Sequence, residues 1–425
     1  METLKNKLFS QYFLEKYRIG VKSFVRKRSL DFVSVFMFLS NLLKSSLQTE
    51  LDNFFKILQH KELPVNKVTK SAFSQARQKL KYQVFVELNH DQVDFFYDKF
   101  QYRKWHNYRL VAIDGSTCRL PYSKKIVEEF GIADTSETKS PIILSKLSQA
   151  YDMLNHIIID ASLANYHVGE HELAQRHIDY LQKGDLLLFD RNYAAFWLFA
   201  LLLSKGMHFC ARLKVGSWKL AKELAATGEK EMTAEIYASK ASKKKCKELG
   251  LSDKPIKLRF VCFELSTGEK EVLVTDIINE IEYEELENLY HQRWFVEESY
   301  KHLKSRIQIE NFTGKSPLAV RQDFYAKIFT GNLTAILAFP VHRQIKENTK
   351  KRKAEYQLNF TQAVSKMKDS VVLLFVRAAD MVSEYISSLW KLFSANTEIV
   401  RHGRKNPHKF RKSKRIYPTA YKTPK

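Results

Sequence analysis

Two aspartates stand where acidic side chains can hold a metal ion. Asp114 ends the apolar run Tyr108–Asp114, and Asp190 ends the apolar run Asp185–Asp190. Both runs are typical of short β-strands, and ligands of open α/β sheets bind at the carboxyl ends of the strands. Two carboxylates held there repel each other unless a cation lies between them, and oxygen ligands suit Mg²⁺ or Mn²⁺. Taken singly, each aspartate is better explained as the cap of the turn or helix that follows it.

A third acid, Glu297, shares a helix face with cations. The apolar spacing predicts one long helix over Glu282–Arg306. At about 100° per residue, one narrow polar stripe of this helix consists of Tyr290, Arg293, Glu297 and Lys304. The neighbouring apolar stripe, which would seat the helix on the sheet, consists of Leu289, Val296, Leu303 and Ile307, with Tyr300 at its edge. A solvated ion-pair face also explains Glu297, but it explains neither the tyrosine nor the two aspartates.

The order and spacing of these residues resemble the IS4 family of bacterial insertion-sequence transposases. The polar stripe matches the Y-R-E-K signature of that family, within YHQRWFVEESYKHLKSR. Four further segments resemble family blocks in the same order, namely Ser71–Leu80, Ala112–Ser116 with Leu120 and Pro121, Phe189–Tyr193 and Val274–Asp276. The resemblance covers roughly residues 70–340, and it departs from the family at Asp276, where asparagine is common.

The resemblance implies a DDE transposase with an RNase H-like catalytic core. It assigns Asp114, Asp190 and Glu297 as a catalytic triad that binds two Mg²⁺ or Mn²⁺ ions. Two such ions, about 3.5–4 Å apart, would stabilise the attacking and leaving oxygens of an in-line displacement. The implied reaction cleaves DNA at terminal inverted repeats and joins the freed ends to target DNA. The implied partner is double-stranded DNA, held by a homodimer in a synaptic complex.

The resemblance also indicates which residues contact DNA. Tyr290, Arg293 and Lys304 are expected to hold phosphates near the cleaved bond, because arginine grips a phosphate through two donors and lysine acts as a point charge. Lys301 and Arg119 are further candidates, and solvated surface charge explains both of them equally well.

Related enzymes pass through a DNA hairpin, which requires an extruded base to stack on an aromatic side chain. Trp218 is the candidate for this stacking, with ordinary packing as the alternative. His167 and His171 are spaced so that both could bind zinc from one helix, but the sequence offers no third ligand in register with them.

The elements that position these residues alternate between strands and helices. Strands are expected at Tyr108–Asp114, Leu147–Tyr151, His156–Leu163, Asp185–Asp190 and His208–Leu213, and helices at 171–182, 193–203 and 318–341. A hairpin is expected to pair Ile256–Glu264 with Glu271–Asp276. The expected fold class is therefore α/β, an RNase H-like catalytic core with a β-rich insertion, preceded by an all-helical N-terminal domain.

Within the N-terminal region, Ser71–Leu80 is expected to be an amphipathic helix capped by Ser71. Its apolar stripe would consist of Phe73, Ala76 and Leu80, which leaves Arg77 to face DNA. A helix-turn-helix DNA reader and an ordinary helical bundle both fit this pattern.

The expected domains follow these elements. They are a helical DNA-binding domain (1–105), the first part of the catalytic core (106–213), the β-rich insertion (214–272), the second part of the core with the signature helix (273–345), a C-terminal helical region (346–400) and a basic disordered tail (401–425). The tail holds ten Lys/Arg and no acid, and solubilisation explains it as well as phosphate contact does.

Composition agrees with a nucleic-acid partner. Lys+Arg 70 against Asp+Glu 47 gives a net charge of +23, and aromatic residues make up 13%. The high aromatic content argues against a disordered protein, and the excess positive charge favours a folded protein that binds a polyanion. The longest apolar run, Leu186–Leu203, contains Asp190 and Arg191, so no membrane span and no signal peptide are expected. The four cysteines are widely spaced, which favours a reducing cytoplasm. The resemblance to IS4-type transposases implies a bacterial, nucleoid-associated protein.

Two other functions remain open from the sequence. One is a metal-dependent endonuclease that cuts DNA without joining it. The other is a transposase-derived repressor that binds DNA without cutting it. Binding alone would not require three acids, because carboxylates near phosphates weaken binding when no cation neutralises them.

Overall fold

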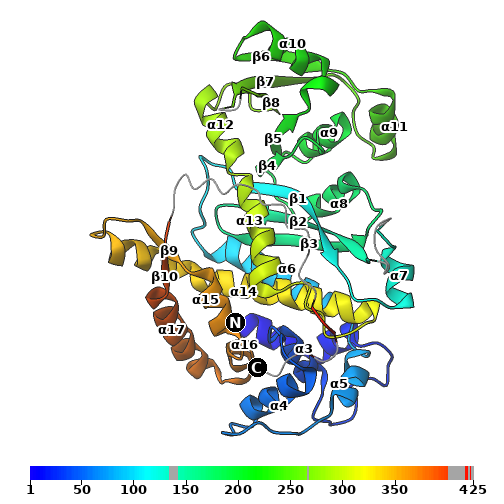
Figure 1. Cartoon of the computed structure of the whole chain (residues 1–425), viewed down its shortest axis with the longest axis vertical. Coiled ribbons are helices and arrows are strands. Elements are labelled where there is room, and N and C mark those ends of the chain that lie inside the picture. Colours follow the sequence, from blue (N-terminus) through cyan, green and yellow to red (C-terminus); the bar gives the residue numbers. More distant parts are fainter. Residues whose placement is uncertain (134–141, 266–267, 401–416, 420–421, 423–425) are drawn as a thin grey trace. The chain divides into compact units, whose positions relative to one another are not determined.

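The computed structural model describes residues 1–133, 142–265, 268–400, 417–419 and 422. These residues form two compact units (Figure 1). The first unit comprises Met1–Phe100, Cys118–Ser145 and Lys301–Lys425, and the second comprises Gln101–Thr117 and Lys146–Tyr300. The predicted basic tail falls outside the described residues, except for 417–419 and 422.

Most of the second unit is built on one sheet. In the described part of the chain this sheet has eight strands, in the order β3-β2-β1-β4-β5-β8-β7-β6. The strands span β1 (Leu110–Arg119), β2 (Leu144–Asp152), β3 (Ile157–Asn165), β4 (Leu186–Phe189), β5 (His208–Leu213), β6 (Glu231–Ile236), β7 (Ile256–Glu264) and β8 (Lys270–Thr275). Strands β1, β4 and β5 are parallel neighbours, so their carboxyl ends lie at one edge. The predicted α/β class, with a helical region that precedes the sheet, is confirmed.

The predicted hairpin is confirmed as β7 and β8, which pair antiparallel from Arg259 with Thr275 to Glu264 with Lys270. The insertion does not form a separate sheet, because β8 pairs antiparallel with β5. Its strands therefore extend the catalytic sheet on the side of β5. Short helices α10 (Lys219–Thr227) and α11 (Lys240–Glu248) accompany them.

The prediction of one continuous helix over Glu282–Arg306 is wrong. Helix α12 (Tyr283–His291) ends before Gln292 and Arg293, α13 (Trp294–His302) begins after them, and Leu303–Ile307 winds as a π-helix. At the break, Arg293 N donates to Tyr290 O and Val296 N donates to Arg293 O. These bonds span three residues instead of four, and such tighter turns often mark functional sites. The apolar stripe remains buried throughout.

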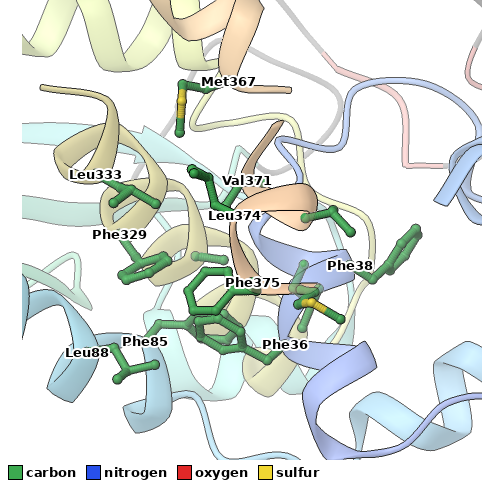
Figure 2. Packing of buried hydrophobic residues seen from close by; sticks show 14 of the residues in the cluster. Phe36, Phe38, Phe85, Leu88, Phe329, Leu333, Met367, Val371, Leu374 and Phe375 are labelled. Carbon is green, nitrogen blue, oxygen red and sulfur yellow. The ribbon is translucent and has the colours of Figure 1, made fainter. Parts of the chain in front are cut away.

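The first unit is helical, and its core joins both ends of the chain. Its helices are α1 (Glu2–Phe9), α2 (Gln11–Tyr17), α3 (Phe32–Ser40), α4 (Leu47–Leu58), α5 (Lys70–Arg77), α6 (Gln83–Lys99), α7 (Lys124–Phe130), α14 (Pro317–Thr349), α15 (Phe360–Met367), α16 (Ser370–Val376) and α17 (Ala379–Ala395), with β9 (Tyr356–Leu358) paired to β10 (Thr397–Ile399). Figure 2 shows how Phe36, Phe85, Phe329 and Phe375 meet in one cluster. The Phe36 ring stacks on Phe85 with centroids 4.9 Å apart. The N-terminal helices thus share their core with the C-terminal ones.

Helix α14 is long and apolar enough to cross a membrane by length and composition alone. In the protein, 83% of its most apolar window is buried, and Figure 1 shows other helices packed around it. Its apolar character therefore serves the core of the first unit.

Helix α5 corrects two predictions. Its cap is Thr69, which accepts a hydrogen bond from Ala72 N, and not Ser71. Arg77 does not face outward: its side chain is 5% exposed and forms an ion pair with Asp323, with Nη2 and Oδ1 2.7 Å apart. Arg77 also donates to Gln322 Oε1 and Ala319 O on α14. The predicted stripe of Phe73, Ala76 and Leu80 is buried, as expected.

Candidate active site

Asp114 lies within strand β1 and not at its end, because β1 continues to Arg119. The side chain is 18% exposed. Its Oδ1 accepts a hydrogen bond from Gly115 N at 2.8 Å, and Tyr300 Oη donates to its carbonyl oxygen at 2.6 Å. Burial raises the pKa of Asp114 to about 6; nearby Asp190 and Glu297 also raise it, while Arg293 lowers it. A carboxyl group with a raised pKa in a site of like charges is a functional candidate.

Asp190 directly follows β4, at the edge where the parallel strands end. Its Oδ1 accepts a hydrogen bond from Asn192 N at 2.8 Å, and Tyr193 N donates to its carbonyl oxygen. The capping role that the sequence left open is therefore real. It does not exclude a second role, since a carboxylate has a further oxygen and Asp190 is only half buried.

Arg293 connects two of the predicted acids. Its Nη2 lies 3.2 Å from Glu297 Oε1, and its Nη1 lies 3.9 Å from Asp114 Oδ2. The side chain of Arg293 is 11% exposed, and its Nε is buried with no hydrogen-bond partner among the described residues. Burial would lower the pKa of Arg293, but the charges of Tyr290, Asp114, Glu297 and Asp190 raise it overall. Despite the helix break, Arg293 and Glu297 thus stay on one face.

The donor chemistry of this site fits a hard divalent ion. The three carboxylates offer oxygen ligands, and the raised pKa of Asp114 shows that its negative charge is poorly neutralised there. Within the described ranges, however, no three His, Cys, Asp or Glu side chains lie close enough to hold one ion together. Arg293 contacts two of the acids, so metal binding would require some of these side chains to change rotamer.

The aromatic candidates have contrasting surroundings. Tyr290 is buried, 4% exposed, and the guanidinium of Arg293 lies 5.8 Å from its ring centroid. Trp218 is half buried, with its ring 6.3 Å from that of Phe199, which agrees with the packing alternative. Trp294 was not singled out in the sequence, yet it is 57% exposed directly beside Arg293. Its position after the signature arginine was the only available signal.

The other predicted DNA contacts belong to the first unit. Lys301 is exposed on α13, and Lys304 lies in the π-helix. Arg119 is half buried, and its backbone N donates to Glu310 Oε1. Arg77 is not available to contact DNA, because it forms a buried ion pair with Asp323. The remaining three stay predictions.

Three residues around Asp114 were missed by the sequence reasoning as parts of this site. Tyr300 donates to the Asp114 carbonyl, Tyr193 is buried beside the acids, and Glu170 packs on Gly115.

Comparison with known proteins places this geometry in a family. A family model described as a transposase DDE domain matches residues 105–333. The chain is similar to the transposase InsG of insertion sequence element IS4 from Escherichia coli, with 23% identity over 64% of this chain and 62% of the relative. It is also similar to the putative transposase InsZ of the same organism, with 28% identity over 39% of this chain and 56% of the relative. The chain thus spans less than two thirds of the length of these curated relatives.

Among solved structures, the chain is similar to a piggyBac transposase in a synaptic complex with hairpin DNA. The TM-score is 0.47 at 10% identity, over 91% of this chain and 84% of that one. The family match covers more than half of the chain and includes Asp114, Asp190, Arg293 and Glu297. The chain therefore belongs to the transposase DDE domain family, and the resemblance to IS4-type transposases is confirmed.

Proposed function

We propose that this chain is the DNA transposase of an IS4-type insertion sequence. It binds the terminal inverted repeats and carries out metal-dependent DNA cleavage followed by strand transfer. The observation that carries the proposal is the position of Arg293 between Asp114 and Glu297, within the residues that match the DDE family. Two Mg²⁺ or Mn²⁺ ions, held by these carboxylates, would stabilise the attacking and leaving oxygens at the cleaved phosphodiester.

Each residue at this site has a separate proposed role. The carboxylates supply oxygen ligands, and the Tyr300 hydroxyl fixes the backbone of Asp114 from α13. Arg293, released from Glu297, has the planar donor pair that grips a phosphate. For the hairpin step, Trp294 is better exposed than Trp218 for stacking on an extruded base, because base stacking requires a free ring face.

A groove in the first unit supports duplex binding. It encloses about 830 Å³ between the segment after α2 and helix α5. Its cations are Lys22, Arg26, Arg28 and Lys79, and no acid lines it. The two walls are tied together, since Ile19 N donates to Lys79 O and Arg18 pairs with Leu80. A groove whose charged lining residues are all cations suits phosphate contacts, and it can take the role that Arg77 cannot fill.

The test compares Glu297→Gln with Glu298→Gln on DNA that carries the inverted repeats flanking the gene. Glu298 is the adjacent, exposed acid on α13, so it is a matched control. We expect Glu297→Gln to bind this DNA but not cut it with Mg²⁺, and Glu298→Gln to act as the wild type. Normal cleavage by Glu297→Gln would refute the assigned triad.

The products separate the alternatives. Cleavage without strand-transfer products would identify a metal-dependent endonuclease, and binding without cleavage by the wild type would identify a repressor. We further propose that the protein forms a homodimer in the synaptic complex, and light scattering in the presence of inverted-repeat DNA measures the mass of that complex. The proposed location is the cytoplasm, in association with the nucleoid.

A further inference from the structure

A buried chain of polar side chains reaches the backbone of Asp114 within the second unit. His177 lies on helix α8 (Glu170–Ile178), Asp160 lies on β3 and Ser148 lies on β2. His177 Nδ1 is 2.6 Å from Asp160 Oδ2, and its Nε2 is 2.9 Å from Ser148 Oγ. Ser148 Oγ in turn donates to the Asp114 carbonyl oxygen at 3.3 Å. All three side chains of the chain are buried.

The order of these side chains is that of an acid, a base and a nucleophile, but Ser148 does not face a substrate. Only 1% of Ser148 is exposed, and its hydroxyl is bonded to a backbone carbonyl. A serine hydroxyl has one proton, so while it donates to Asp114 O it accepts from His177 Nε2–H. Buried networks in which every group is bonded make the surrounding structure rigid. This chain of side chains therefore holds a backbone in place.

The peptide group between Asp114 and Gly115 links the chain to the Asp114 carboxylate. The carbonyl oxygen of this group accepts from Ser148 and, at 2.6 Å, from Tyr300 Oη. Its N–H, on Gly115, donates to Asp114 Oδ1 at 2.8 Å. A peptide group is planar and stiff, so fixing its oxygen also fixes the direction of its N–H. Hydrogen bonds made at one end of the peptide group thus orient the carboxylate bonded at the other end.

We propose that His177, held by Asp160, is a positioning residue that orients the Asp114 carboxylate through the Ser148 hydroxyl. The inference rests on the proposed function, because that function makes Asp114 a catalytic residue. Catalytic side chains work only when they are held within about 0.5 Å of the productive geometry, and buried supporting hydrogen bonds secure this.

The first test needs neither metal nor DNA. Hydrogen exchange of the Gly115 amide is measured in EDTA at single-residue resolution, relative to the other amides of β1. This ratio cancels a loss of global stability, because global unfolding speeds the exchange of all these amides together. We expect Ser148→Ala to speed exchange at Gly115 about five- to tenfold relative to the rest of β1, the effect of losing one buried hydrogen bond.

Ser145→Ala is the matched control. Ser145 is also buried on β2, and its Oγ also donates to a carbonyl oxygen of β1 at 3.3 Å, that of Cys118. This variant removes an equivalent bond further along β1, so it should leave Gly115 exchange as in the wild type. Unchanged Gly115 exchange in Ser148→Ala, or an equal rise in both variants, would overturn the inference. If Ser148→Ala fails to fold, Ser148→Cys takes its place, because a thiol fills the same space and is only a weak donor.

A combined variant tests the part played by His177. His177→Leu is made together with Asp160→Asn, so that no buried carboxylate is left without its partner. This pair of changes should raise Gly115 exchange as Ser148→Ala does. Adding Ser148→Ala to the pair should raise it no further, because all these changes break the same chain. Additive effects would show that His177 does not act through Ser148, which would refute the proposal.

DNA cleavage with Mg²⁺ separates this inference from the proposed function. We expect Ser148→Ala to lower kcat about tenfold or more with KM for DNA unchanged, since small displacements of catalytic groups cost large factors in rate. Ser145→Ala should cleave as the wild type does. An unchanged kcat in Ser148→Ala would overturn the inference and leave the proposed function standing. A wild-type protein that cuts no DNA would overturn the proposed function, whereas the exchange experiment would still decide how Asp114 is held.

Discussion

Replacing Asp114 by asparagine should stabilise the metal-free protein. The pKa of Asp114 is raised from 3.8 to about 6, mainly by burial. At one pKa unit per 1.36 kcal/mol, ionising Asp114 costs the folded state up to about 3 kcal/mol. Asparagine carries no charge, and its side-chain oxygen can still accept the hydrogen bond from Gly115 N. The variant therefore escapes this cost.

The pH dependence has a defined sign. A carboxyl group whose pKa is higher in the folded than in the unfolded state binds more protons when folded, so stability falls as pH rises from about 4 to 6. Below pH 4, Asp114 is protonated in both states, and the variant gains nothing. Above pH 6, the full difference applies. A gain of 1–3 kcal/mol corresponds to a rise in Tm of roughly 2–10 °C for a unit of this size.

Differential scanning calorimetry in EDTA, from pH 4 to pH 8, measures this directly. The Tm difference between variant and wild type should be absent at pH 4 and positive at pH 7.5. Added Mn²⁺ should raise the Tm of the wild type more than that of the variant. An Asp114→Asn protein that is less stable than the wild type at pH 7.5 in EDTA would contradict the argument.

Two further predictions concern the first unit. Arg77→Met should destabilise it by about 3–5 kcal/mol, because Asp323 on α14 is left buried without its cation. Arg321→Met is the control: Arg321 also lies on α14 but forms a partly exposed pair with Glu129 on α7, so its loss should cost about 1 kcal/mol or less. Urea denaturation measures both variants, and equal losses of stability would count against the structural role of Arg77. Arg26→Glu should weaken duplex binding and flatten its salt dependence, since log K falls by about 0.9 per phosphate contact for each tenfold rise in salt, while Lys61→Glu outside the groove should change neither. Filter binding at several salt concentrations measures both variants. Identical salt slopes for Arg26→Glu and the wild type would show that the groove does not bind DNA.

The strands were predictable from the sequence because each is a short apolar run bounded by turn residues. The expected strand His208–Leu213 has the bounds of β5, and Ile256–Glu264 has those of β7. Local patterns settle such elements because each one buries its own apolar face.

Long-range partners were not predictable in the same way. Arg77 looked free because nothing within its own helix neutralises it, whereas its partner Asp323 lies 246 residues away. The break at Gln292 and Arg293 also left no local signal, since neither residue is a glycine or a proline. Spacing nevertheless placed Arg293 and Glu297 on one face, because one tight turn rotates the following helix by only part of a turn.

The net charge of +23 and the carboxylates act over different distances. Solvent and salt screen surface cations beyond about 8–10 Å, so they attract DNA without neutralising a buried acid. Burial is the main cause of the raised pKa of Asp114, and Arg293, which lies beside it, lowers that pKa. Groups in contact with Asp114 therefore neutralise it, namely Arg293 or a bound ion. DNA affinity and Mn²⁺ affinity should therefore respond to separate variants: Arg26→Glu should weaken DNA binding and leave Mn²⁺ binding unchanged, whereas Asp114→Asn should weaken Mn²⁺ binding.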